Sequence, residues 1–114
     1  MADDDPRPIP WLKAGGHDAE AEILALPKRP RERALAVLGR LSQLPRTQLG
    51  LKKTHIDDIW EKKHVVPEGA LRILFIYGKT DLWCIGGFVK RNDSEGNNLL
   101  KRRYVAVANI ARNL

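Results

Sequence analysis

Three apolar runs separated by short turns constrain the fold more than any other feature of the chain. The runs read "IDDIWEKKHVV", "ALRILFIYG" and "DLWCIGGFVK", and the separators are residues 67–69 (PEG) and 78–81 (GKTD). Separators this short join antiparallel neighbours. The sequence therefore predicts consecutive hairpins with strands at 56–66, 70–78 and 81–90. Gly86 and Gly87 predict a bulge or a close backbone approach in the third strand.

The middle run is apolar on both faces of the expected sheet. Its alternating faces hold Leu71, Ile73, Phe75 and Tyr77 on one side and Arg72, Leu74 and Ile76 on the other. A strand covered on both faces lies inside a sheet, so Arg72 is a cation in a central strand. Two interpretations of Arg72 stay open. Either it is a solvated strand start or a partner of Glu61, or it presents its guanidinium to a phosphate.

Helices are predicted on either side of these strands. The first starts near Asp18 and ends before Pro27, and the second has Pro30 in its first turn. Apolar residues at helical spacing mark the second helix: Ala34, Val37, Leu38, Leu41 and Leu44. A last helix from about Asn98 is expected to bury Leu100, Tyr104, Val107, Ala111 and Leu114. With a short edge strand and a glycine turn in "IPWLKAGG", the fold class is α+β.

The length of 114 residues predicts a single domain at 9–114 behind a flexible tail at 1–8. No apolar run approaches the roughly 20 residues that a membrane span needs. The acidic start predicts no secretory signal. A single cysteine, Cys84, excludes an internal disulfide and suits the cytoplasm, and its place in an apolar strand predicts an inert thiol.

Positive charge is concentrated in one part of the chain. The net charge is +6, and residues 28–63 hold ten lysines and arginines against four acids. Such a surface favours a polyanionic or acidic partner, although a solvated basic face would have the same composition. Lys52 and Lys53 lie at the centre of a basic loop, "RTQLGLKKTH".

Cations at the strand ends predict a phosphate site. Lys62 and Lys63 point to opposite faces, and Lys90 and Arg91 end the last strand. We expect Arg72, Arg91 and one of Lys62 or Lys63 to converge on one rim of the sheet. Such a cluster would hold a phosphodiester and stabilise extra negative charge in a transition state.

Other chemistries find little support. His17, His55 and His64 are scattered, so we expect no metal site. The chain has no glycine-rich phosphate loop. Ser42 and Ser94 lie outside any nucleophile motif. We therefore expect no cofactor.

The stretch "IWEKKHVVPEGALRILFIYGKTDLWCIGGFVKR" resembles the RelE/HigB superfamily of bacterial and phage toxins, in its phage-encoded HigB-like branch. The pieces that carry the resemblance are residues 59–63 (IWEKK), 72–75 (RILF) and 88–91 (FVKR). The resemblance extends over about residues 9–112, because the expected helices follow the order of the family.

The resemblance implies a small RelE-like, microbial-ribonuclease-like fold: an antiparallel sheet packed against two N-terminal helices, plus a C-terminal helix. It implies the toxin of a type II toxin–antitoxin system, acting as a ribosome-dependent, metal-independent mRNA endoribonuclease. The ribose 2′-hydroxyl would attack the adjacent phosphate. Expected partners are mRNA on the ribosome and a cognate antitoxin, a small helix-turn-helix protein.

Residue roles carried over from the resemblance divide into two sets. The catalytic set is Arg72, Arg91, Lys90 and Lys63, and the RNA-binding set is Lys52, Lys53, Lys62 and Tyr104. Lys62 stands where the family usually has leucine. This change either supplies an added RNA contact or marks a degenerate site. The general base stays open among Lys62, Lys63, Glu61 and Tyr104.

Two further interpretations remain. One is a non-enzymatic ParE-like toxin that poisons gyrase. The other is a catalytically inactive, phage-derived binding module in which the cations merely solvate the strand ends.

Overall fold

The main sheet has four antiparallel strands. The structure of the protein, a computed structural model, describes residues 5–91 and 93–114, leaving aside the side chains of residues 93–95. The strands are β3 (Lys52–Lys53), β4 (Trp60–Val66), β5 (Gly69–Tyr77) and β6 (Leu82–Lys90), in spatial order β3-β4-β5-β6. The three predicted strands and the inner position of β5 are confirmed, and β3 is an addition.

The first predicted strand starts later than expected. Residues 56–59 form a turn instead, because Thr54 ties the chain back on itself. Its backbone N–H donates to the carbonyl of Ile59 at 2.9 Å, and its hydroxyl donates to the same oxygen at 2.8 Å. Asp57 takes a positive φ of 52° within this turn.

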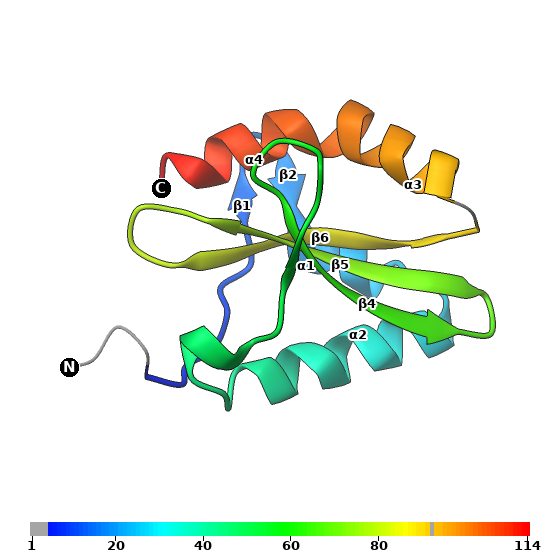
Figure 1. Cartoon of the computed structure of the whole chain (residues 1–114), viewed down its shortest axis with the longest axis horizontal. Coiled ribbons are helices and arrows are strands. Elements are labelled where there is room, and N and C mark those ends of the chain that lie inside the picture. The colour runs from blue at the N-terminus through cyan, green and yellow to red at the C-terminus, as the bar shows by residue number, and fades with distance from the viewer. Residues whose placement is uncertain (1–4, 92) are drawn as a thin grey trace.

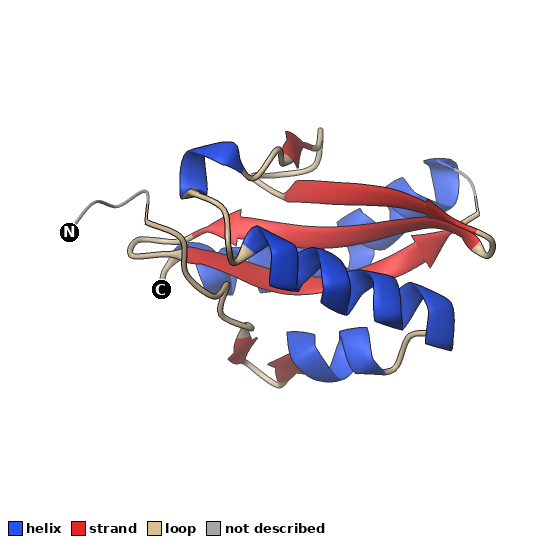
Figure 2. Ribbon diagram, turned by 90° about the horizontal axis from the view of Figure 1, so that it is seen from below, coloured by secondary structure: helices blue, strands red, loops and turns tan. Residues whose placement is uncertain are grey.

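Helices cover both faces of the sheet (Figures 1 and 2). They are α1 (Ala19–Leu24), α2 (Lys28–Leu41), α3 (Asp93–Leu99) and α4 (Val105–Arg112), together with the 3₁₀ turn η1 (Arg46–Gln48) and the π turn η2 (Leu100–Tyr104). The α2 side buries Leu71, Ile73 and Phe75 against Val37 and Leu41, and the α4 side buries Leu74, Ile76 and Ile85 against Tyr104 and Val107. This is the predicted α+β class.

The N-terminal part of the chain extends the sheet beyond β6. Leu12 N–H donates to the carbonyl of Cys84 at 2.9 Å, and Cys84 N–H donates to that of Pro10 at 3.0 Å. The short strands β1 (Lys13–Ala14) and β2 (His17–Asp18) follow, joined by glycines at φ 59° and 80°. Asp18 then caps α1 by accepting from Ala21 N–H at 3.0 Å.

The predicted tail at 1–8 divides into two parts. Residues 1–4 lie outside the described residues. The carbonyls of Arg7 and Pro8 accept hydrogen bonds from the guanidinium of Arg46, at 2.9 and 3.0 Å. These hydrogen bonds attach the chain to the rest of the protein from residue 7 onwards.

The C-terminal helical segment starts earlier than predicted, at Asp93 instead of Asn98. The π turn inserts one residue into it, which keeps Leu100 and Tyr104 both buried. Leu114 is 41% exposed rather than buried. The reason is that α4 ends at Arg112, so Leu114 leaves the apolar stripe of the helix.

The glycine pair in β6 forms the predicted bulge. Leu74 pairs with Gly86 but Phe75 pairs with Cys84, which leaves Ile85 as the extra residue. Gly86 has a φ of 139°, a conformation that residues with a side chain rarely adopt. The bulge lies under α1, where the N–H of Gly87 donates to the carboxylate of Glu22.

Candidate functional site

A basic cleft opens on the sheet face that α3 overlies. Its volume is about 360 Å³. It is lined by Lys52, Lys53, Thr54, His55, Glu61, Lys63, Arg72 and Asn97. Cationic side chains outnumber the one carboxylate among these residues, so the cleft suits an anionic ligand.

Strand register explains why these side chains meet. Lys52 of β3 pairs with Glu61 of β4, and Lys63 of β4 pairs with Arg72 of β5. Paired residues of antiparallel strands share one face, and so do residues two apart along a strand. Lys52, Glu61, Lys63 and Arg72 therefore form a patch across three neighbouring strands.

Arg72 lies at the floor of the cleft with only 7% of its surface exposed. Its Nε is 3.1 Å from Oε2 of Glu61, whose side chain is also largely buried. The expected pairing of these two residues is thus observed. The pair fixes the guanidinium in the sheet and places a carboxylate beside Lys52 and Lys63.

Lys90 lies next to Arg72 beneath α3 and is 3% exposed. A methyl group at Gly96 of α3 would meet Cδ of Lys90 at 2.9 Å and Nη1 of Arg72 at 3.2 Å. The absence of a side chain at Gly96 therefore lets α3 approach both cations closely. Lys90 accordingly supports the cleft from below instead of lining it.

Three of the predicted site residues lie away from the cleft. Lys62 points to the opposite face, where its amino group donates to the carbonyls of Leu49 and Gly50 at 3.2 and 3.4 Å. Arg91 is exposed beyond the end of β6 and does not line the cleft. Tyr104 is fully buried.

The expected convergence of Arg72, Arg91 and a lysine is therefore corrected. Arg72 meets Lys63 and Lys90, because strand alternation turns Lys62 to the other face and Arg91 lies beyond the end of β6.

Three residues of the cleft, Thr54, His55 and Asn97, have no recognisable signal in the sequence. His55 is one of three scattered histidines, and Asn97 precedes the predicted start of the last helix. His55 reaches the cleft because the two-residue strand β3 carries the chain to the sheet edge. Two residues are too few for a recognisable strand pattern. Of the proposed general bases, Glu61 and Lys63 line the cleft, whereas Lys62 and Tyr104 do not.

Outside the lining of the cleft, Glu22 connects α1, the bulge and the π turn. Its Oε1 accepts from Gly87 N–H at 3.1 Å and from the hydroxyl of Tyr104, and its Oε2 lies 3.3 Å from Nη2 of Arg103. Burial raises the pKa of this carboxyl, and the hydrogen bond from Gly87 opposes that rise. Tyr104 in turn stacks on Phe88, with ring centroids 6.0 Å apart.

His17 and Cys84 are structural groups. The Nε2 of His17 is 2.7 Å from the carbonyl of Ile85, which fixes the imidazole against the bulge. The Cys84 thiol is fully buried, and burial raises its pKa to about 12. It stays protonated near neutral pH, as its place in an apolar strand predicts.

Comparison with protein-family models, curated proteins and solved structures returns no match. Among the side chains of residues 5–91 and 96–114, no three of His, Cys, Asp or Glu gather in a way that could hold a metal ion. No helix in the described part of the chain is long and apolar enough to cross a membrane.

Proposed function

We propose that the chain is the toxin of a type II toxin–antitoxin pair and cleaves mRNA on the ribosome at the basic cleft. One observation carries the proposal: β3, β4 and β5 place Lys52, Lys63 and Arg72 side by side on one face. Lysine and arginine donors are the groups that bind and stabilise phosphodiester oxygens. The layered sheet and helices also support the RelE-like fold that the resemblance implies.

The proposed reaction is an internal transfer that needs no cofactor. A base takes the proton of the ribose 2′-hydroxyl, and the 2′-oxygen attacks the adjacent phosphorus. The bond to the 5′-oxygen breaks, and that oxygen leaves with a proton from an acid. The products are a 2′,3′-cyclic phosphate and a 5′-hydroxyl.

The cleft residues have distinct proposed roles in this reaction. Lys52 and Lys63 neutralise the extra charge on the nonbridging oxygens. Arg72 holds Glu61 in place through the 3.1 Å contact. Glu61, Lys63 and His55 are the candidates for proton transfer, because they line the cleft. The proposed partners are mRNA on the ribosome and a small helix-turn-helix antitoxin, which places the protein in the cytoplasm.

A second candidate, RNA binding without cleavage, is favoured by the burial of the strand cations. Arg72 is engaged by Glu61, and Lys90 is 3% exposed. Separating a buried ion pair is costly, so Arg72 stays with Glu61 instead of turning to a ligand. A module of this kind would use Lys52, Lys53 and Lys63 alone.

Primer extension on total mRNA after brief induction tests the proposal. Lys63→Gln removes a charge from the cleft, and Lys62→Gln is the matched control, because it removes the same charge from the other face of β4. We expect discrete breaks inside translated frames with wild type and Lys62→Gln, and at least about a tenfold loss with Lys63→Gln. Intact mRNA with arrested growth would point to another target such as gyrase, and intact mRNA with normal growth to a binding module.

A further inference from the structure

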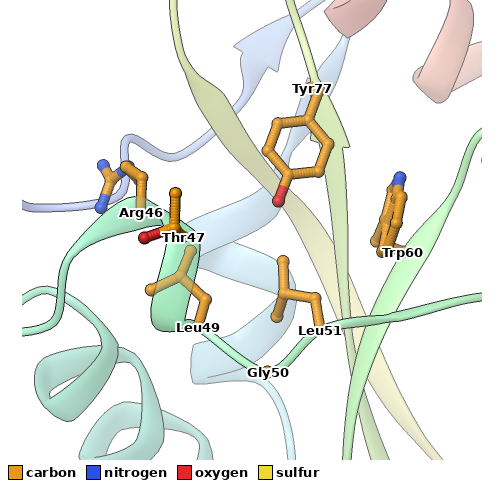
Figure 3. A pocket seen from close by; sticks show the side chains of 7 residues that line it. All are labelled: Arg46, Thr47, Leu49, Gly50, Leu51, Trp60 and Tyr77. Carbon is orange, nitrogen blue, oxygen red and sulfur yellow. The ribbon is translucent and has the colours of Figure 1, made fainter. Parts of the chain in front are cut away.

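An apolar pocket lies on the α2 side of the sheet, at the end of β4 and β5 away from the β4–β5 turn. Its volume is about 560 Å³. Figure 3 shows the side chains of Leu49, Leu51, Trp60 and Tyr77 around it, with the Tyr77 hydroxyl pointing into the space between η1 and Trp60. We call it the Trp60–Tyr77 pocket. This volume is within the range of ligand sites, about 300–1,000 Å³.

The aromatic walls of the pocket are already arranged for binding. The rings of Trp60 and Tyr77 meet edge to face at 5.5 Å between centroids, with an angle of 89° between their planes. Tyr77 nevertheless remains 46% exposed. Tryptophan and tyrosine side chains are enriched at the energetic centres of protein interfaces, because on binding they bury a large area at little entropic cost.

The charge around the pocket is mostly positive. Arg46 lines it, and the amino group of Lys62 is held against the wall by the carbonyls of Leu49 and Gly50. A neighbouring hollow that shares Arg46 and Tyr77 adds Arg7 and Lys79, against a single carboxylate of the described residues, Asp81. Arg7 and Arg46 both bind Asp81, at 3.3 and 3.4 Å. Four cations against one acid attract an acidic partner.

The shape of the pocket favours a peptide over a nucleic acid. Base stacking needs an open aromatic face, whereas here the two rings are perpendicular and the aliphatic Leu49 and Leu51 close the other walls. A second copy of this chain is disfavoured by its net charge of +6. The walls suit one large apolar side chain, and the surrounding charge suits carboxylates beside it.

We propose that the Trp60–Tyr77 pocket binds an acidic peptide segment of a partner protein, which inserts an aromatic or large aliphatic side chain between Trp60, Tyr77 and Leu51. The inference does not depend on the chemistry of the basic cleft, because Trp60 and Lys62 face away from Glu61 and Lys63. Binding here therefore leaves the cleft open. It also contacts Leu49, Gly50 and Leu51, which continue directly into Lys52 and Lys53.

A selection from random peptides displayed on phage, using the full chain as bait, tests the proposal. The enriched peptides are synthesised with a fluorescein label and titrated by fluorescence anisotropy. We expect them to carry a Trp, Phe or Leu flanked by Asp or Glu. Leu51→Asp and Tyr77→Ser are each expected to weaken binding by about tenfold or more. Val65→Asp is the matched control, since Val65 is 85% exposed and outside the pocket.

Thermal unfolding of each variant verifies its fold, and Tyr77→Ser changes a residue that is exposed enough to leave the core intact. Enrichment of basic or charge-free peptides would overturn the proposal. So would equal binding to wild type and both pocket variants, or loss of binding in Lys63→Gln, which would place the peptide in the basic cleft. If Tyr77→Ser instead weakens the binding of a labelled single-stranded RNA, the pocket belongs to a nucleic-acid surface.

Discussion

Two glycines of the chain differ in the space around them, and the difference sets the effect of a methyl group. Gly86 has a φ of 139°, and a side chain there would collide with Oε1 of Glu22. Gly39 lies inside α2 with nothing within 4 Å. We expect Gly86→Ala to lower the free energy of unfolding by about 3 kcal/mol. Gly39→Ala should raise it by about 0.5–1 kcal/mol, because alanine favours the helix.

Urea denaturation of both variants measures this difference. Equal effects of the two substitutions would show that neither the bulge conformation nor the contact with Glu22 constrains the chain at Gly86.

The buried carboxyl of Glu22 predicts how the stability of the protein depends on pH. Burial raises the pKa of this carboxyl in the folded protein above the unfolded value of about 4.3. Above pH 4.3 the unfolded state loses this proton first, so the folded state binds more protons and stability falls as pH rises. The contribution of Glu22 to the free energy of unfolding is fully present below the pKa that its carboxyl has in the unfolded state. It is lost once the pH exceeds the pKa of the same carboxyl in the folded state.

Replacement by glutamine removes this titration. The stability of Glu22→Gln relative to wild type should therefore increase from pH 4 upwards and become constant above the folded pKa, as followed by urea denaturation at several pH values. Glu32→Gln, at an exposed position on α2, controls for the loss of one negative charge. A relative stability that decreases over this range would contradict the assignment.

Among the elements, the loop before β4 depends on a contact with α4. Arg112 lies 2.8 Å from Oδ2 of Asp57 and 3.3 Å from Oδ2 of Asp58. This loop carries His55 into the cleft. We expect Arg112→Gln to speed amide hydrogen exchange at Thr54 by about fivefold, in keeping with an exposed ion pair, with little change in global stability.

The exchange of Thr54 reports the loop, because its N–H donates to the carbonyl of Ile59 across the turn. Arg102→Gln, at an exposed position of the π turn, is the control. Unchanged exchange in Arg112→Gln would mean that the loop holds its shape without α4.

Long, strongly patterned elements could be predicted from the sequence. The two-sided apolar pattern of β5 predicts its place inside the sheet, and the short turn before it predicts that one of Lys62 or Lys63 lies near Arg72. Strand alternation also separated Lys62 from Lys63. These features depend on local spacing, which the chain displays directly.

Elements fixed by tertiary contacts could not be predicted. β3 has two residues and exists because it pairs with β4, so His55 had no visible place in the site. Glu22 is an acid within α1 with no local partner, because its partners Gly87 and Tyr104 are 65 and 82 residues away in the chain. The burial of Lys90 depends on how closely α3 approaches at Gly96.

For the whole molecule, the net charge of +6 and the basic cleft predict a salt-dependent interaction with RNA. Three exposed lysines line the cleft: Lys52, Lys53 and Lys63. At about −0.7 for each neutralised phosphate, a plot of log affinity against log salt should have a slope of about −2 for single-stranded RNA. Fluorescence anisotropy at several salt concentrations measures the slope.

Lys63→Gln should make that slope shallower by about 0.7, whereas Lys62→Gln should leave it unchanged. An equal change in both variants would show that RNA binds to the charge of the whole molecule and not to the cleft.

The alternation of side chains along β4 couples the basic cleft to the Trp60–Tyr77 pocket. Glu61 and Lys63 face the basic cleft, and Trp60 and Lys62 face the α2 side. Sliding β4 by one residue against β5 would exchange these two sets and abolish the cleft and the Trp60–Tyr77 pocket together. An insertion or deletion within β4 that shifts its register, instead of being absorbed as a bulge like the one in β6, therefore changes both surfaces at once.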